Sequence, residues 1–155
     1  MITFYLITTL LLLLLFCLLL LIFFHHRRIR HMEPYKKGSL TVRELDTLDG
    51  IAFEELVCEI LCANDFELAE NTPASRDFGV DILARKDGMT YAIQCKRYLE
   101  PVGIDAVQQV YAGRAFYECH VAVVLTNQTF TNAAITLADK LGVVLWDREI
   151  LRSLL

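Results

Sequence analysis

The spacing of apolar and polar positions changes along the chain, and each spacing predicts a type of element. Apolar residues recur every three to four positions, as in helices, over residues 47–63, 104–116 and 132–141 and again after residue 146. Short β-branched and apolar runs predict strands at 67–71, 79–84, 91–96, 120–126 and 143–146. Because strands alternate with helices in the second half, we expect parallel pairing there. The pattern predicts a small α/β sandwich with a mixed sheet.

Turn and cap residues bound several of these elements. Lys86-Asp87-Gly88 lies between the second and third strands, and a D-G dipeptide between apolar runs favours a hairpin. Thr131 is the expected N-cap of the helix 132–141, and Gly142 is its expected end. Asp147 is the expected cap of the last helix.

A long apolar run precedes the domain. Residues 4–24 contain no charged residue and are dominated by leucine. As a helix they would extend ~31 Å, enough to cross the hydrocarbon core of a bilayer. A cleaved signal peptide is the alternative, but no Lys or Arg precedes the run and no small-residue cleavage site follows it. We therefore expect a transmembrane helix over 4–24.

The segment that follows is basic. Arg27, Arg28 and Arg30 lie directly after the apolar run, and Lys36 and Lys37 come next. Positive charge on this flank predicts that the C-terminal side stays in the cytoplasm. We expect a single-pass protein of the cell membrane, with a basic juxtamembrane linker at 25–44 and one cytoplasmic domain at 45–155.

The predicted helix 47–63 contains two neighbouring glutamates. At ~100° per residue, Glu54 lies on the border of the apolar face that includes Phe53, whereas Glu55 points to solvent. Glu54 is therefore the better candidate for a site, although a solvated carboxylate explains most helix glutamates.

The second and third strands carry a candidate hydrolytic site. Asp81 offers a hard oxygen ligand for a divalent metal. Gln94 and Lys96 are two residues apart on one strand, so they point to the same face beside it.

The motifs that carry a family resemblance are Phe53-Glu54, the run from Thr72 to Asp81, Gln94-Cys95-Lys96-Arg97-Tyr98, and the later runs 107–113 and 124–131. Over about residues 45–155 the chain resembles the catalytic domain of the Mrr family of restriction endonucleases, in the PD-(D/E)xK nuclease superfamily. The resemblance implies a restriction-endonuclease-like three-layer sandwich, with a central mixed sheet flanked by helices. It also implies DNA phosphodiester hydrolysis with Mg²⁺ or Mn²⁺.

The resemblance suggests a role for each candidate. Glu54, Asp81, Gln94 and Lys96 form the catalytic set. Asp81 is the main metal ligand, with the side-chain carbonyl of Gln94 and the backbone carbonyl of Cys95 beside it. Glu54 is a further ligand, directly or through water. Lys96 holds the attacking water or stabilises developing negative charge.

Candidates for DNA contact are Ser75, Arg76, Arg97, Gln108 and Gln109. Ser75 and Arg76 are explained equally well as residues of an ordinary polar loop. Gln108 and Gln109 are explained equally well as exposed polar residues of a helix. From Glu44 onward, 18 acids against nine bases give a formal charge of −9, which opposes DNA binding. Bound cations and local basic residues can offset this charge near the site. We expect weak, salt-sensitive binding.

The sequence thus predicts a membrane-anchored, metal-dependent DNA endonuclease in restriction or defence against foreign DNA. The alternative is a non-catalytic DNA-binding or sensor module with the nuclease fold. No helix-turn-helix or zinc-finger spacing is present, so a separate specificity partner stays open, as does a homodimer.

The domain's four cysteines, Cys58, Cys62, Cys95 and Cys119, are expected to be buried thiols. A zinc site from the first two would need two more ligands, which the sequence does not show.

Overall fold

The computed structural model describes residue 1 and residues 13–20, 35–72 and 78–155, in two units, Met1–Pro34 and Tyr35–Leu155. In the first unit, residues 13–20 are helical. They belong to the predicted transmembrane helix 4–24, of which the rest lies outside the described residues. Among the helices that the structure describes, none has the length and apolar character needed to cross a bilayer.

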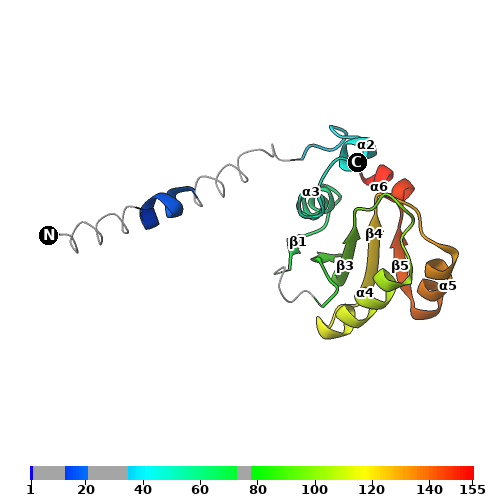
Figure 1. Ribbon diagram of the computed structural model, residues 1–155. Coiled ribbons are helices and arrows are strands. Elements are labelled where there is room, and N and C mark those ends of the chain that lie inside the picture. The colour runs from blue at the N-terminus through cyan, green and yellow to red at the C-terminus, as the bar shows by residue number, and fades with distance from the viewer. Residues whose placement is uncertain (2–12, 21–34, 73–77) are drawn as a thin grey trace. The chain divides into compact units, whose positions relative to one another are not determined.

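The second unit is built on a five-stranded mixed sheet. Its strands are β1 (Leu68–Asn71), β2 (Ile82–Lys86), β3 (Met89–Lys96), β4 (Val121–Thr126) and β5 (Val143–Trp146). They lie side by side in sequence order. The pairs β1–β2 and β2–β3 are antiparallel, whereas β3–β4 and β4–β5 are parallel (Figure 1). The predicted parallel pairing in the second half is confirmed.

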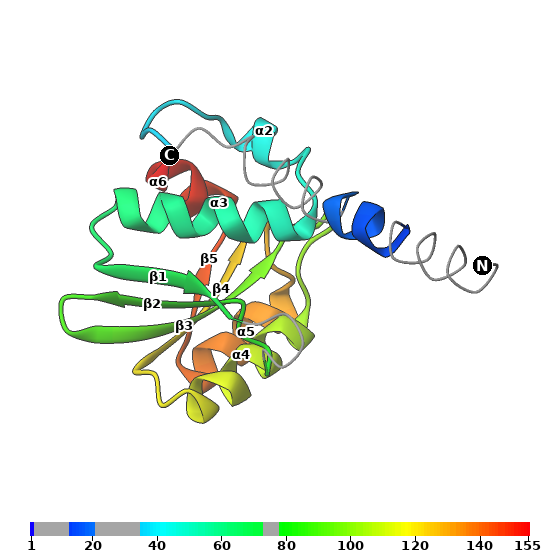
Figure 2. The ribbon, with the colours of Figure 1, turned by 90° about the vertical axis from the view of Figure 1, so that its left-hand side faces the viewer.

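Helices cover both faces of the sheet (Figure 2). One face packs against α2 (Val42–Leu45), α3 (Gly50–Ala63) and α6 (Arg148–Leu154), and the other against α4 (Ile104–Phe116) and α5 (Asn132–Leu141). Alternate strand residues enter two separate cores, as period-two side-chain direction requires. Ile93 and Cys95 belong to the core beneath α3, and Ala92 belongs to the core beneath α4. The predicted three-layer sandwich is confirmed.

Local chemistry explains where several elements begin and end. The Thr131 hydroxyl accepts a hydrogen bond from the Ala134 N–H, and Gly142 ends α5 in the left-handed region. Asp147 caps α6. In the hairpin between β2 and β3, Asp87 and Gly88 both have positive φ, as a two-residue type I′ turn requires. These caps and the turn are as predicted.

Two predicted element starts are wrong, and one short helix was not predicted. The helix expected from residue 47 begins at Gly50, because the Asp49 side chain accepts the Ala52 N–H and caps it there. The strand expected from residue 79 begins at Ile82, because Phe78 and Gly79 have positive φ and interrupt the extended backbone. The short helix α2 was not predicted, although the Thr41–Glu44 capping box that begins it is visible in the sequence.

The segment before α2 contacts both α3 and the C-terminus. The Tyr35 N–H donates to Glu59 Oε2 at 2.7 Å, and the Tyr35 hydroxyl donates to the Leu155 carbonyl at 2.6 Å. Burial raises the pKa of this hydroxyl, so it remains a donor at neutral pH. The sequence assigned residues 35–44 to the linker, but in the structure they belong to the second unit.

Two glycines allow α4 to approach the segment that leads into β2. A Cβ on Gly113 would lie 2.4 Å from Val80 Cγ2 and 2.6 Å from the Phe78 carbonyl oxygen. A Cβ on Gly79, where φ is +77°, would lie 2.7 Å from Gln109 Cβ. Because neither glycine has a side chain, α4 can lie close to the residues around Asp81.

We predict that Gly113→Ala lowers the free energy of unfolding by about 1–3 kcal/mol, because the new methyl group overpacks this contact. Gly50→Ala is the matched control. Its Cβ meets nothing within 4 Å, so that variant should be at least as stable as the parent. Urea unfolding of both variants measures the difference, and equal stability of Gly113→Ala and the parent would contradict the proposed close packing.

Candidate active site

The candidate site is built around the carboxylate of Asp81, directly before β2. The Asp81 N–H donates to the Ile93 carbonyl at 2.9 Å, which extends the β2–β3 pairing by one residue. Asp81 Oδ2 accepts hydrogen bonds from Gln94 Nε2 and from the Cys95 N–H, the latter at 2.7 Å. The carboxylate therefore joins the two strands through a side chain and a main-chain group.

Both partners of this pair are buried. Asp81 is 8% exposed and Gln94 is 4% exposed. The other amide atom of Gln94, Oε1, is buried and has no hydrogen-bond partner among the described residues. An unsatisfied buried oxygen costs about 1–3 kcal/mol, so it calls for a ligand or another explanation.

A cavity of about 300 Å³ lies over this pair. Its walls come from α3, the segment before β2, β3 and α4. The lining residues are Glu54, Gly79, Asp81, Gln94, Cys95, Lys96 and Gln109. The fold thus brings together the four residues predicted to be catalytic and, with them, Cys95 and Gln109.

Glu54 comes from the opposite side of the sheet to Gln109. Glu54 is half-buried on α3, whereas its neighbour Glu55 is exposed, in agreement with the helical phase. Gly79 was missed by the sequence reasoning. Its signal was present, because a glycine two residues before the main carboxylate often marks a place where backbone approaches another element closely.

Of the remaining DNA-contact candidates, those that the structure describes do not line this cavity. Ser75 and Arg76 lie outside the described residues. Gln108 is exposed on α4 and does not line the cavity. Arg97 instead turns toward the loop before α3, where its Nη1 donates to the Asp46 carbonyl at 3.4 Å, and its Nε is buried without a hydrogen-bond partner in the described part of the chain.

A smaller cavity of about 160 Å³ shares Lys96 and Gln109 with the first one. It extends the site toward the start of α4, along Tyr98, Gly103 and Asp105. Lys96 and Gln109 thus stand at the boundary between the two cavities.

The thiol of Cys95 is buried in the core beneath α3. Burial, with the nearby charge of Asp81, raises its pKa well above the usual value, so the thiol stays neutral. Burial also raises the pKa of Cys58 to about 12, and its Sγ–H donates to Asn71 Oδ1 at 2.9 Å. Cys95 is buried as predicted, but Cys62 is exposed, because it lies on the outer face of α3.

Within the described residues, no group of three or more His, Cys, Asp or Glu side chains could hold a metal ion. A metal site built from carboxylate, amide and main-chain carbonyl oxygens does not need three such side chains, so this finding does not test for one.

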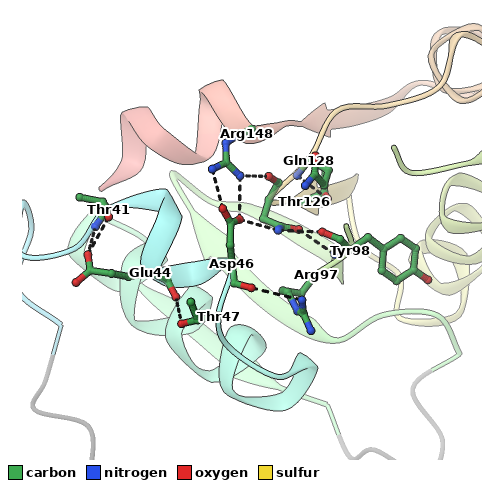
Figure 3. A network of polar contacts seen from close by, with 10 residues as sticks. Thr41, Glu44, Asp46, Thr47, Arg97, Tyr98, Thr126, Gln128 and Arg148 are labelled. Carbon is green, nitrogen blue, oxygen red and sulfur yellow. Dashed lines mark hydrogen bonds and ion pairs between the residues drawn. The ribbon is translucent and has the colours of Figure 1, made fainter. Parts of the chain in front are cut away.

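A polar network holds the chain that follows Lys96 (Figure 3). The Arg148 guanidinium binds both carboxylate oxygens of Asp46, each at 2.8 Å. Asn127 Nδ2 donates to Asp46 Oδ1 at 2.8 Å and to the Tyr98 carbonyl at 3.0 Å. Its Oδ1 accepts the Tyr98 N–H at 2.9 Å. The start of α6, the end of β4 and the loop before α3 therefore meet beside the segment that carries Lys96.

The fold and this cavity define a restriction-endonuclease-like domain. A family model described as "Restriction endonuclease", the Mrr catalytic domain, matches residues 45–155. The chain belongs to this family. No curated protein matches the sequence.

Several solved structures share the fold at low identity. The DNA modification-dependent restriction endonuclease AspBHI is 16% identical, with a TM-score of 0.54, over 73% of this chain and 32% of its own. A protein of unknown function, AF1548, is 21% identical, with a TM-score of 0.52, over 61% and 55%. Protein VC1899 from Vibrio cholerae is 16% identical, with a TM-score of 0.51, over 68% and 32%. This chain therefore spans only about a third to a half of these structures.

The Asp46–Arg148 pair predicts a pH dependence of stability. Its hydrogen bond to Arg148 lowers the pKa of Asp46 below the usual value. The pair therefore contributes stability above the unfolded-state pKa of about 3.9, and this contribution is lost as the pH falls through the lower folded pKa. We expect Asp46→Asn to lower the free energy of unfolding by about 1–2 kcal/mol at pH 7, and by less as the pH falls below ~4.

Urea unfolding between pH 7 and pH 3 measures this difference. Glu149→Gln is the control, since it removes a carboxylate from the exposed Arg152–Glu149 pair and should change stability little. A constant difference between Asp46→Asn and the parent at every pH would argue against the ion pair.

Proposed function

We propose that this protein is a metal-dependent DNA endonuclease whose active site is the cavity over Asp81. One observation carries the proposal most directly. Gln94 Oε1 is buried and has no hydrogen-bond partner among the described residues, and Gln94 lines a cavity together with Asp81 and Lys96. Most buried polar atoms have a hydrogen-bond partner, so an oxygen that has none and belongs to a cavity-lining residue is a candidate ligand.

The residues fit a hard divalent cation, Mg²⁺ or Mn²⁺. Asp81 supplies a carboxylate and Gln94 an amide oxygen, while the main-chain carbonyl of Cys95 and the carboxylate of Glu54 complete the donor set. When bound, such a cation would activate water for attack and neutralise charge on the reacting phosphate. Gln94 brings one negative charge fewer than a second carboxylate would, so we infer modest metal affinity.

The protein's own groups have separate roles in this proposal. The hydrogen bonds from Gln94 and Cys95 to Asp81 Oδ2 fix the orientation of the carboxylate. Lys96 places an ammonium group in the cavity, where it would orient the attacking water and stabilise charge that develops on the phosphate. Gln109 on α4 would contact the phosphate from the opposite wall.

A second candidate function is a DNA-binding or sensor module without catalysis. The formal charge of −9 from Glu44 onward favours it, because phosphate binding normally needs a basic surface. The convergence of Glu54, Asp81, Gln94 and Lys96 on one cavity favours catalysis, and we give it more weight.

Cleavage of supercoiled plasmid by the purified full-length chain distinguishes the two functions. At low salt with Mg²⁺ or Mn²⁺ we expect nicking or linearisation by the parent. Asp81→Ala and Lys96→Ala should each lower the rate by about 10²–10³-fold, because each removes a group that stabilises the transition state.

The matched controls are Asp139→Ala and Lys140→Ala, which remove the same charges from exposed positions on α5 and should keep the parent rate. A folded parent that binds DNA without cutting it would support the non-catalytic module. Cutting by Asp81→Ala at the parent rate would mean that the active site is misplaced.

We further propose that residues 4–24 anchor the protein in the cell membrane as a single span, with the nuclease domain in the cytoplasm. The uncharged, leucine-dominated run and the arginines after it support this proposal. Restriction of incoming foreign DNA fits such a location. A homodimer would let two sites cut both strands, and a separate specificity partner would supply sequence recognition.

Membrane fractionation tests the anchor. The full-length chain should remain with membranes after alkaline carbonate extraction, whereas Leu14→Lys combined with Leu15→Lys should release a large fraction, because charge at the centre of a span costs about 2.5–3.5 kcal/mol per residue. Recovery of the unmodified chain in the soluble fraction would contradict the anchor without affecting the nuclease proposal.

A further inference from the structure

We propose that Thr126 and Asn127, held in place by Asp46 and Arg148, are positioning residues that fix Lys96 in the active site. This inference rests on the proposed nuclease function, in which the Lys96 ammonium acts on the reacting phosphate. It assigns a catalytic consequence to a network that lies outside the cavity and that contains none of the proposed metal ligands.

The backbone around Lys96 is held on both sides. On the preceding side, the Cys95 N–H donates to Asp81 Oδ2 at 2.7 Å. On the following side, the Thr126 hydroxyl donates to the Lys96 carbonyl at 2.7 Å. One bond therefore links the lysine to the carboxylate of the site, and the other links it to the end of β4.

Asn127 extends this hold by two residues. Its side-chain amide binds both the N–H and the carbonyl of Tyr98, at 2.9 Å and 3.0 Å. The Asn127 side chain therefore hydrogen-bonds the backbone after β3 as a neighbouring strand would within the sheet. The segment from Lys96 to Tyr98 consequently keeps its direction after regular β3–β4 pairing has ended at Lys96 and Thr126.

Asp46 and Arg148 fix the orientation of the Asn127 amide. Asn127 Nδ2 donates to Asp46 Oδ1 at 2.8 Å, while Arg148 binds the same carboxylate and also donates to the Asn127 carbonyl at 2.7 Å. Figure 3 shows Arg148 and Asp46 facing each other beside Thr126 and Tyr98. The amide of Asn127 therefore has one orientation that satisfies all of its partners.

The burial of these residues points to a role beyond stability. Thr126 and Asn127 are completely buried, at the end of a strand whose other residues, from Ala122 to Leu125, are apolar and buried. Apolar side chains could fill this space without the cost of removing polar groups from water. What they could not do is hold the backbone of Lys96 and Tyr98 in register with Asp81. Displacement of a catalytic group by about 1 Å can lower a rate by about 10²-fold.

The experiment compares single-turnover DNA cleavage by the parent, Thr126→Val, Thr126→Ser and Asn127→Ala, each as the purified full-length chain. Thr126→Val keeps the shape and removes the hydroxyl, so we expect the rate to fall by about 10–100-fold. Thr126→Ser keeps the hydroxyl and should restore most of the rate. The Mn²⁺ concentration that gives half-maximal rate should stay within about twofold of the parent value, because Asp81 and Gln94 are untouched.

Two comparisons separate positioning from general stability. Asn132→Ala, which changes an exposed asparagine on α5, is the control for Asn127→Ala. In addition, Thr126→Val is measured in the Lys96→Ala background. If Thr126 acts through Lys96, removing the Thr126 hydroxyl should lower the rate little in the Lys96→Ala background, since the lysine side chain that it positions is already absent.

The outcomes are distinct. Failure of the parent to cut DNA would contradict the proposed function, and this inference with it. If the parent cuts, a folded Thr126→Val with the parent rate would overturn the inference alone. An equal loss in the Lys96→Ala background would overturn it as well. Should Asn127→Ala fail to fold, Thr126→Val against Thr126→Ser still decides the matter.

Discussion

The carboxylate of Asp81 is the point on which the site depends. It lies just before β2, yet its two hydrogen-bond donors, Gln94 Nε2 and the Cys95 N–H, both belong to β3. The register of the hairpin, with Ile82 opposite Ile93, places these groups together. A shift of one residue would turn Gln94 and Lys96 to the other face, so the turn at Asp87 and Gly88 is also a constraint on the chemistry.

Close packing on the α4 side sets the width of the cavity. Gly79 and Gly113 let the backbone before Asp81 lie against α4, and Gln109 enters the cavity as a result. From the other side, α3 contributes Glu54 at the border of its buried face. The two helix layers thus meet the sheet at the edge of the same site, and the sandwich architecture is what allows residues from both layers to line one cavity.

Much of the fold and part of the site could be predicted from the sequence, because local patterns determine them. The bounds of α4, α5 and β5 follow from periodicity and caps, and Glu54 follows from helical phase. The Asp46, Asn127 and Arg148 network could not be predicted. Asp46 and Arg148 are 102 residues apart, and each has an ordinary local explanation as a loop or helix residue. The same holds for the hydrogen bond from Arg97 to the Asp46 carbonyl, while the predicted contact of Arg97 with DNA stays a prediction.

The most direct test is to measure Mn²⁺ binding to the metal-free protein, with the electron paramagnetic resonance signal reporting the concentration of free ion. We predict saturable Mn²⁺ binding by the parent and none by Asp81→Ala. Binding should be weaker in Gln94→Ala and tighter in Gln94→Glu, since the second carboxylate adds a charged ligand. Asp139→Ala should bind as the parent does. Equal binding by the parent and Asp81→Ala, or no binding by a folded parent, would contradict the claim that Asp81 and Gln94 form a metal site.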